Sequence, residues 1–127
     1  MSEIATISDL IAQKMQKEEK QNETLEITVG NMEKPLVFRK LNDKELIEFM
    51  GLISDADDME KNIKAIDTLI YNCCPALQDT ELHNQLDVND PEDIPSMLWT
   101  VAERIALSDE LSDFLNLENK EIELKNS

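Results

Sequence analysis

With 127 residues, the chain has the length of a single domain and can bury a hydrophobic core. Its formal net charge of −16 argues against direct binding to nucleic acid phosphates or to anionic membranes, because like charges repel. Aromatic residues make up only 4% of the chain, so aliphatic side chains and methionine must fill the core, which favours helices over a β-sandwich or barrel.

The acidic excess is divided unevenly along the chain. Residues 1–40 hold seven acidic and six basic residues, whereas residues 41–127 hold twenty-one acidic and six basic ones. No run approaches the ~20 apolar residues of a membrane span, and acidic Glu3 and Asp9 stand where a secretory signal has basic residues. We therefore expect a cytoplasmic protein whose acidic part attracts a basic partner.

Residues 1–23 are predicted to form an amphipathic helix followed by a polar linker. Within residues 6–17, apolar side chains recur at helical spacing, at Ile7, Leu10, Ile11 and Met15. Residues 16–23 are almost all charged or amide-bearing, which is typical of a solvated linker. This helix is therefore predicted to be free to pack on another chain.

Residues 24–117 are predicted to form one domain that begins with a β-hairpin. Residues 24–29 alternate apolar and polar side chains at the period of a half-buried strand, and residues 35–41 are the expected partner strand. The intervening residues, 30–34, have the length and the turn residues of a hairpin loop. Two strands alone are marginally stable, so helices must cover them.

Helices are expected to follow the hairpin. Asn42 and Glu45 have the spacing of a capping box, which predicts a helix that ends near Ser54. Apolar residues between Met59 and Cys73 repeat every three or four positions and predict the clearest helix of the chain. Pro75 is expected to end that helix, because the residue before a proline avoids helical geometry.

The C-terminal part is predicted to hold three further helices. Asp79 and Asp90 are each expected to cap a helix start. From Ile94 to Leu107 apolar residues cover more than half of the helical circumference, so this helix is either central or also touches a partner. A last helix is predicted to begin at Ser108.

The predicted fold class is α+β and mostly helical, with an N-terminal helix, one β-hairpin and then about four to five packed helices. Residues 118–127 are mostly polar and are predicted to form a frayed tail.

No catalytic, cofactor-binding or metal-binding residues are predicted. Cys73 and Cys74 are adjacent, so a relaxed disulfide between them is disfavoured and free thiols are expected. These cysteines and His83 lack an evident fourth ligand for zinc. Phosphate-binding loops need several glycines, whereas Gly30 and Gly51 stand alone. The sequence therefore predicts a binding protein that is not an enzyme.

Candidate partner-contacting residues are apolar side chains of the predicted helices: Ile7, Leu10, Ile11, Trp99, Leu111 and Phe114. Trp99 is the only tryptophan of the chain and lies at the edge of the wide apolar face. Core packing and partner docking both fit it, since tryptophan is often buried and is also enriched where partners dock.

Several runs of residues also carry a family likeness. They are Phe38-Arg39-Lys40-Leu41, Ile70-Tyr71-Asn72-Cys73-Cys74-Pro75-Ala76-Leu77-Gln78-Asp79 and Val88-Asn89-Asp90-Pro91-Glu92-Asp93-Ile94. In these runs and in the order of its elements, the chain resembles the XkdN-like family of phage tail assembly chaperones over residues 24–115.

The resemblance implies a small, non-enzymatic phage or prophage protein that binds the long helical tape measure protein and keeps it soluble during tail tube assembly. The tail tube protein is a second candidate partner, and self-association is a further expectation. The resemblance also implies that the protein acts in the cytoplasm of the bacterial host and is absent from the mature virion. The alternative is an acidic inhibitor or DNA mimic that binds a basic partner.

Overall fold

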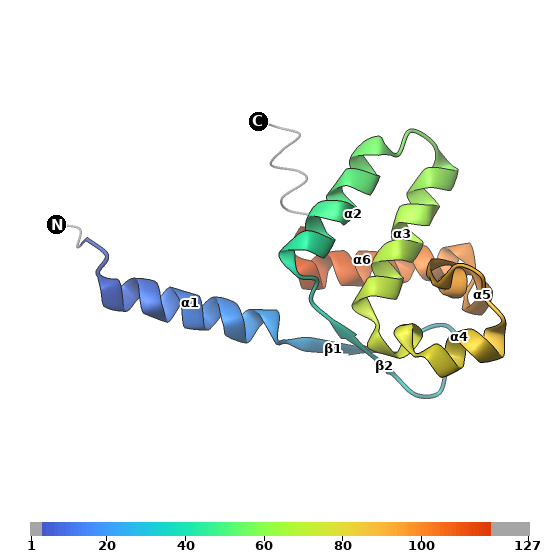
Figure 1. Cartoon of the computed structure of the whole chain (residues 1–127), viewed down its shortest axis with the longest axis horizontal. Helices are drawn as coiled ribbons and strands as arrows, with labels where there is room; N and C mark the ends of the chain where they lie inside the picture. Colours follow the sequence, from blue (N-terminus) through green and yellow to red (C-terminus); the bar gives the residue numbers. More distant parts are fainter. Residues whose placement is uncertain (1–3, 118–127) are drawn as a thin grey trace.

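An N-terminal helical arm, a two-stranded hairpin and a group of packed helices follow one another along the chain (Figure 1). The computed structural model describes residues 4–117. Its elements, in chain order, are α1 (Ile7–Gln21), β1 (Thr24–Ile27), β2 (Leu36–Arg39), α2 (Asp43–Asp55), α3 (Met59–Cys73), the 3₁₀ turn η1 (Pro75–Gln78), α4 (Thr80–Leu86), the 3₁₀ turn η2 (Pro91–Asp93), α5 (Ile94–Leu98) and α6 (Val101–Leu115).

These elements confirm the predicted fold class, which is α+β and mostly helical with one hairpin. The predicted polar tail, residues 118–127, lies outside the described residues.

α1 continues through most of the segment that was predicted to be a polar linker. Residues 16–21 are helical, because Lys, Glu and Gln are good helix formers. Lys14 also pairs with Glu18 one turn later, with 3.2 Å between Nζ and Oε1. Two residues, Asn22 and Glu23, separate the helix from β1. The linker prediction is therefore wrong, and the arm runs almost directly into the hairpin.

The hairpin forms where it was predicted, with shorter strands. β1 and β2 pair antiparallel, and Leu25 lies opposite Phe38, whose side chain is completely buried. Each strand has four residues, fewer than the predicted ranges of 24–29 and 35–41. Gly30, at a φ of 57°, takes the left-handed conformation that the turn between the strands requires.

The two glycines predict opposite effects of the same substitution. A Cβ on Gly30 is strained at positive φ and meets the Glu103 carboxylate, so we expect Gly30→Ala to lower the unfolding free energy by about 1–3 kcal/mol. Gly51 lies in α2 with no atom within 4 Å of an added Cβ, so Gly51→Ala should raise the unfolding free energy by up to about 1 kcal/mol. Urea unfolding of both variants measures the difference. Equal midpoints would contradict the expectation.

α3 is the central helix of the packed group. It lies beside α2 and crosses α6 (Figure 1). Its buried face supplies core side chains from Ala65, Leu69, Ile70 and Cys73. The predicted end at Pro75 is confirmed, as are the predicted caps at Asn42, Asp79 and Asp90.

A buried ion pair joins α3 to α6. Arg104 Nε donates a hydrogen bond to Asp67 Oδ1 at 2.7 Å, and Arg104 Nη1 donates to the Trp99 carbonyl oxygen at 2.9 Å. Burial raises the pKa of Asp67 above its ordinary value, while the charge and the hydrogen bond of Arg104 oppose that rise. Arg104 therefore connects α3, α6 and the residue that follows α5.

The helix predicted from Ile94 to Leu107 is two helices, α5 and α6. Trp99 between them is extended, and Thr100 caps the start of α6. In this capping box, Thr100 N donates to Glu103 Oε1 at 2.9 Å and Glu103 N donates to Thr100 Oγ1 at 3.1 Å. α6 then passes through Ser108, where a new helix was predicted. The wide apolar face is thus shared by two helices, and the prediction of one continuous helix from Ile94 to Leu107 is wrong.

Candidate partner-binding surfaces

One face of α1 carries exposed apolar side chains along its length. We call Ile7, Leu10, Ile11 and Met15 the α1 stripe. Between 55% and 77% of the surface of each residue is exposed, and no residue of α1 is buried. The arm projects from the packed helices at the end of the hairpin where β1 begins (Figure 1). A helix of this length is marginal alone in water, so an uncovered apolar stripe on it is typical of a contact surface.

A second apolar surface is a groove between the hairpin loop, α4 and the end of α5. Its volume is about 600 Å³, and we call it the Trp99 groove. Its apolar lining comes from Met32, Leu36, Ala76, Leu77, Leu82, Leu98 and Trp99. Asp79 and Glu81 also line it, so an apolar groove carries acidic groups. Apolar walls with a few polar groups are the usual make-up of a binding cleft.

The structure places the predicted contact residues in three different environments. Ile7, Leu10 and Ile11 share the exposed face of α1. Trp99 is 93% buried and lines the groove, so it combines core packing with an accessible edge. The arm precedes β1, whereas the groove includes Met32 in the hairpin loop, so the hairpin separates these two surfaces.

Leu111 and Phe114 are engaged within the domain. Leu111 has no exposed surface, so it cannot be part of a contact surface of the folded protein, and that assignment is wrong. Phe114 is half-buried, and Lys40 Nζ lies 4.3 Å from the centre of its ring. The same Nζ donates a hydrogen bond to the Phe114 carbonyl oxygen. The C-terminal half of α6 therefore packs inward.

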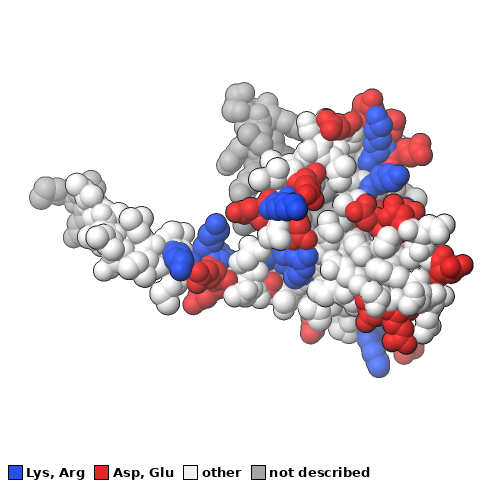
Figure 2. Space-filling view, in the orientation of Figure 1, with Lys and Arg blue, Asp and Glu red and all other residues white. Residues whose placement is uncertain are grey.

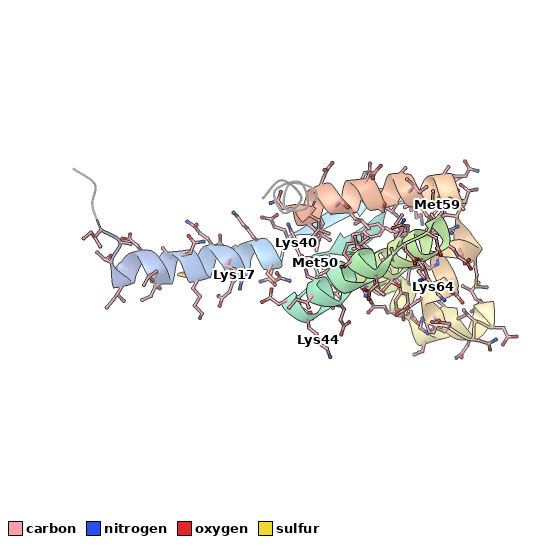
Figure 3. All side chains as sticks on the ribbon, turned by 90° about the horizontal axis from the view of Figure 1, so that it is seen from above. Lys17, Lys40, Lys44, Met50, Met59 and Lys64 are labelled. Carbon is pink, nitrogen blue, oxygen red and sulfur yellow. The ribbon has the colours of Figure 1, made fainter. Side chains whose placement is uncertain are left out.

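Sequence reasoning missed the exposed apolar side chains of the two helices that follow the hairpin. They are Ile47, Met50 and Leu52, along α2, and Met59, at the start of α3. Figure 3 shows Met50 and Met59 on these two helices, which also carry Lys44 and Lys64. The signal was present in the sequence, because Leu46, Phe49 and Ile53 form the inward face of α2 and leave Ile47 and Met50 on its outer side.

Within the described residues, all basic side chains except Arg104 come before residue 65. Lysines lie on α1, in the hairpin loop at Lys34, after β2 and on α2 and α3, and Figure 2 shows basic side chains at the base of the arm, over the packed helices and at the lower edge of the domain. Between residues 65 and 117 there are eleven acidic residues, and Arg104 is the one basic residue. Since Arg104 is buried against Asp67, the surface of α4, η2 and α6 is acidic.

The two cysteines are buried, and one ring nitrogen of the histidine has a partner within the domain. Cys73 and Cys74 are free thiols, as predicted, and burial raises the pKa of Cys73 to about 12. His83 Nε2 lies 2.8 Å from the Leu77 carbonyl oxygen. Within residues 4–117, no cluster of His, Cys, Asp and Glu side chains could hold a metal ion. No helix in that range is long and apolar enough to cross a membrane.

No protein-family model matches this chain, no curated protein matches it, and no solved structure matches it.

Proposed function

We propose that this protein is a phage or prophage tail assembly chaperone that binds the tape measure protein and keeps it soluble while the tail tube assembles. The observation that carries the proposal is the α1 stripe, an uncovered apolar face on an arm that leaves an acidic domain. The protein acts by binding, without an enzymatic reaction, in the cytoplasm of the bacterial host, and it leaves before the virion matures.

The two surface properties match the needs of such a client. A long amphipathic helix exposes apolar stripes, and a second helix with anchors at i, i+3, i+4 and i+8 can cover them, as the α1 stripe does. The covered complex must also stay dissolved, and a net charge of −16 opposes association between complexes. In this proposal, α1 supplies the apolar contact with the client, and the acidic domain keeps the complex in solution.

The runs that resemble the XkdN-like family have structural roles in this fold. Cys74 follows α3 as its C-cap, and Gln78 Nε2 donates to the carbonyl oxygens of Tyr71 and Asn72 at 3.0 and 3.2 Å. Asp90 caps η2 by accepting a hydrogen bond from Glu92 N at 3.1 Å. These contacts give the runs local structural roles in this chain, and the contact surfaces are argued from exposure.

The decisive experiment is coexpression with the tape measure protein of the same phage. We expect the tape measure protein to move from the insoluble to the soluble fraction and to copurify with this chain. The complex should survive high salt, because apolar contact holds it and screening weakens only the charge interactions. If the two proteins do not copurify and this chain does not change the solubility of the tape measure protein, the proposal fails.

An acidic inhibitor or DNA mimic is the second candidate function. The observation that favours it is the acidic surface of α4, η2 and α6, whose single basic residue, Arg104, is buried. A mimic binds through charge, so its complex with a basic nucleic-acid-binding protein should compete with DNA and dissociate as salt rises. Competition against a nuclease or repressor of the host distinguishes it from the chaperone.

A further inference from the structure

We propose that the free protein pairs with a second copy of itself through α1, with the two α1 stripes packed antiparallel around a two-fold axis. The α1 stripe and the charges of the same helix identify the second copy as the occupant. They also decide the orientation of the two helices.

The balance of charge on α1 identifies the partner. α1 carries three acidic and three basic side chains, Asp9, Lys14, Lys17, Glu18, Glu19 and Lys20, and is neutral. The rest of the chain carries the net charge of −16. Two copies that met through the Trp99 groove would bring Asp79 and Glu81 of each together. α1 is therefore the apolar surface on which two copies approach with the least repulsion.

The charge of the rest of the chain fixes the orientation. In a parallel pair, both acidic domains would lie side by side at the same end of the helices. In an antiparallel pair, they lie at opposite ends, separated by the length of α1, which is about 22 Å for its 15 residues. This separation exceeds the Debye length of about 8 Å at physiological salt, so most of the repulsion is screened.

The distribution of charge within α1 favours the same orientation. The N-terminal half of the helix holds Asp9 and has a net charge of −1, whereas the C-terminal half holds three lysines and two glutamates and has a net charge of +1. Antiparallel pairing places the negative half of each helix beside the positive half of the other, and it also opposes the two helix dipoles. Each stripe has four side chains, so the contact is small and the dimer exchanges readily with monomers.

Competition with a client follows from this arrangement, and that consequence rests on the proposed function. A client helix that covers the α1 stripe must displace the second copy, so the dimer protects the stripe until the client appears. The dimer itself does not depend on the client. Loss of client binding with the dimer intact would count against the chaperone alone, and a monomeric protein that binds the client would count against the dimer alone.

Sedimentation equilibrium of the full chain tests the pairing. We expect the mass to rise with concentration from one copy to two and to stop there. Ile7→Glu with Ile11→Glu should remain monomeric, whereas the charge-matched control Ile47→Glu with Met59→Glu should still dimerise. A wild-type monomer at all concentrations overturns the proposal. Growth beyond two copies overturns it too, because an arm inserted into the groove of the next copy forms an open chain.

Disulfide crosslinking of full-length variants tests the orientation. Ile7→Cys and Met15→Cys lie eight residues apart on the stripe, about 12 Å along the helix. Mixing the two variants under oxidation should give the heterodimer, and each alone should crosslink poorly. Efficient crosslinking of Ile7→Cys to itself would show a parallel pair and overturn the proposal. The buried Cys73 and Cys74 do not interfere, since burial raises the pKa of both thiols.

Discussion

Arg104→Met is expected to lower the free energy of unfolding by about 3–5 kcal/mol at neutral pH, because it leaves the carboxylate of Asp67 buried without its partner. The substitution also removes the hydrogen bond to the Trp99 carbonyl oxygen, at the junction of α5 and α6. Methionine fills much of the volume of arginine, so the loss reports the missing charge more than a cavity. Urea unfolding followed by circular dichroism measures it.

The pH dependence of this loss identifies its cause. Burial raises the folded-state pKa of Asp67, so the stability contributed by this group falls as pH rises from its ordinary pKa through the folded value. Without Arg104 the pKa rises further, and the deficit of the variant should narrow at acidic pH, where Asp67 is neutral. A deficit that is independent of pH would point to lost packing instead.

The double variant Asp67→Leu with Arg104→Met is the matched control. Replacing both partners of a buried ion pair by apolar side chains is often neutral, so the double variant should recover most of the stability that Arg104→Met loses. If the double variant is as unstable as Arg104→Met, the buried unpaired charge of Asp67 does not explain the loss of stability. The loss would then come from packing and from the missing hydrogen bond to the Trp99 carbonyl oxygen.

Under the proposed chaperone function, Ile7→Glu with Ile11→Glu is expected to abolish the gain in soluble tape measure protein on coexpression. Two carboxylates on the α1 stripe prevent it from covering an apolar client face, because burying unpaired charges costs more than the contact provides. The free energy of unfolding should change by no more than about 0.5 kcal/mol, since no residue of α1 is buried. The soluble fraction of the client is the readout.

The control for this variant carries the same added charge at another exposed site. Ile47 and Met59 are 68% and 72% exposed, at positions outside the arm. Ile47→Glu with Met59→Glu should retain client solubility, so a common loss in both variants would indicate an effect of net charge. If instead only the control loses activity, the contact surface includes the exposed side chains of α2 and α3 and does not include the α1 stripe.

The parts of the fold that local side chains determine were predictable. Asn42 with Glu45 starts α2 through a capping box, and Pro75 ends α3 because a proline restricts the residue before it. The same local rule applies to Thr100 with Glu103, which interrupts the apolar run between α5 and α6. The apolar run from Ile94 to Leu107 continues on both sides of this cap, so apolar spacing alone predicts one helix there.

Other features depend on contacts between distant residues. Asp67 and Arg104 are 37 positions apart. The sequence around each residue therefore does not predict that its charge is buried against the other. Leu111 occupies the same kind of apolar position as Ile11, and what differs is whether the fold brings another element against it. Periodicity therefore located the apolar faces, but it could not distinguish the exposed face of α1 from the buried face of α6.

The continuity of α1 with the hairpin has a consequence for how a partner is received. A flexible tether would sample many directions, and that freedom would be lost on binding. Here the helix extends to Gln21, whose side-chain amide donates to the Leu41 carbonyl oxygen at 2.9 Å, and two residues later β1 begins. The short connection and this hydrogen bond limit the directions in which the arm can point, so a partner helix that packs along it would lose less orientational freedom than one bound by a flexible tether.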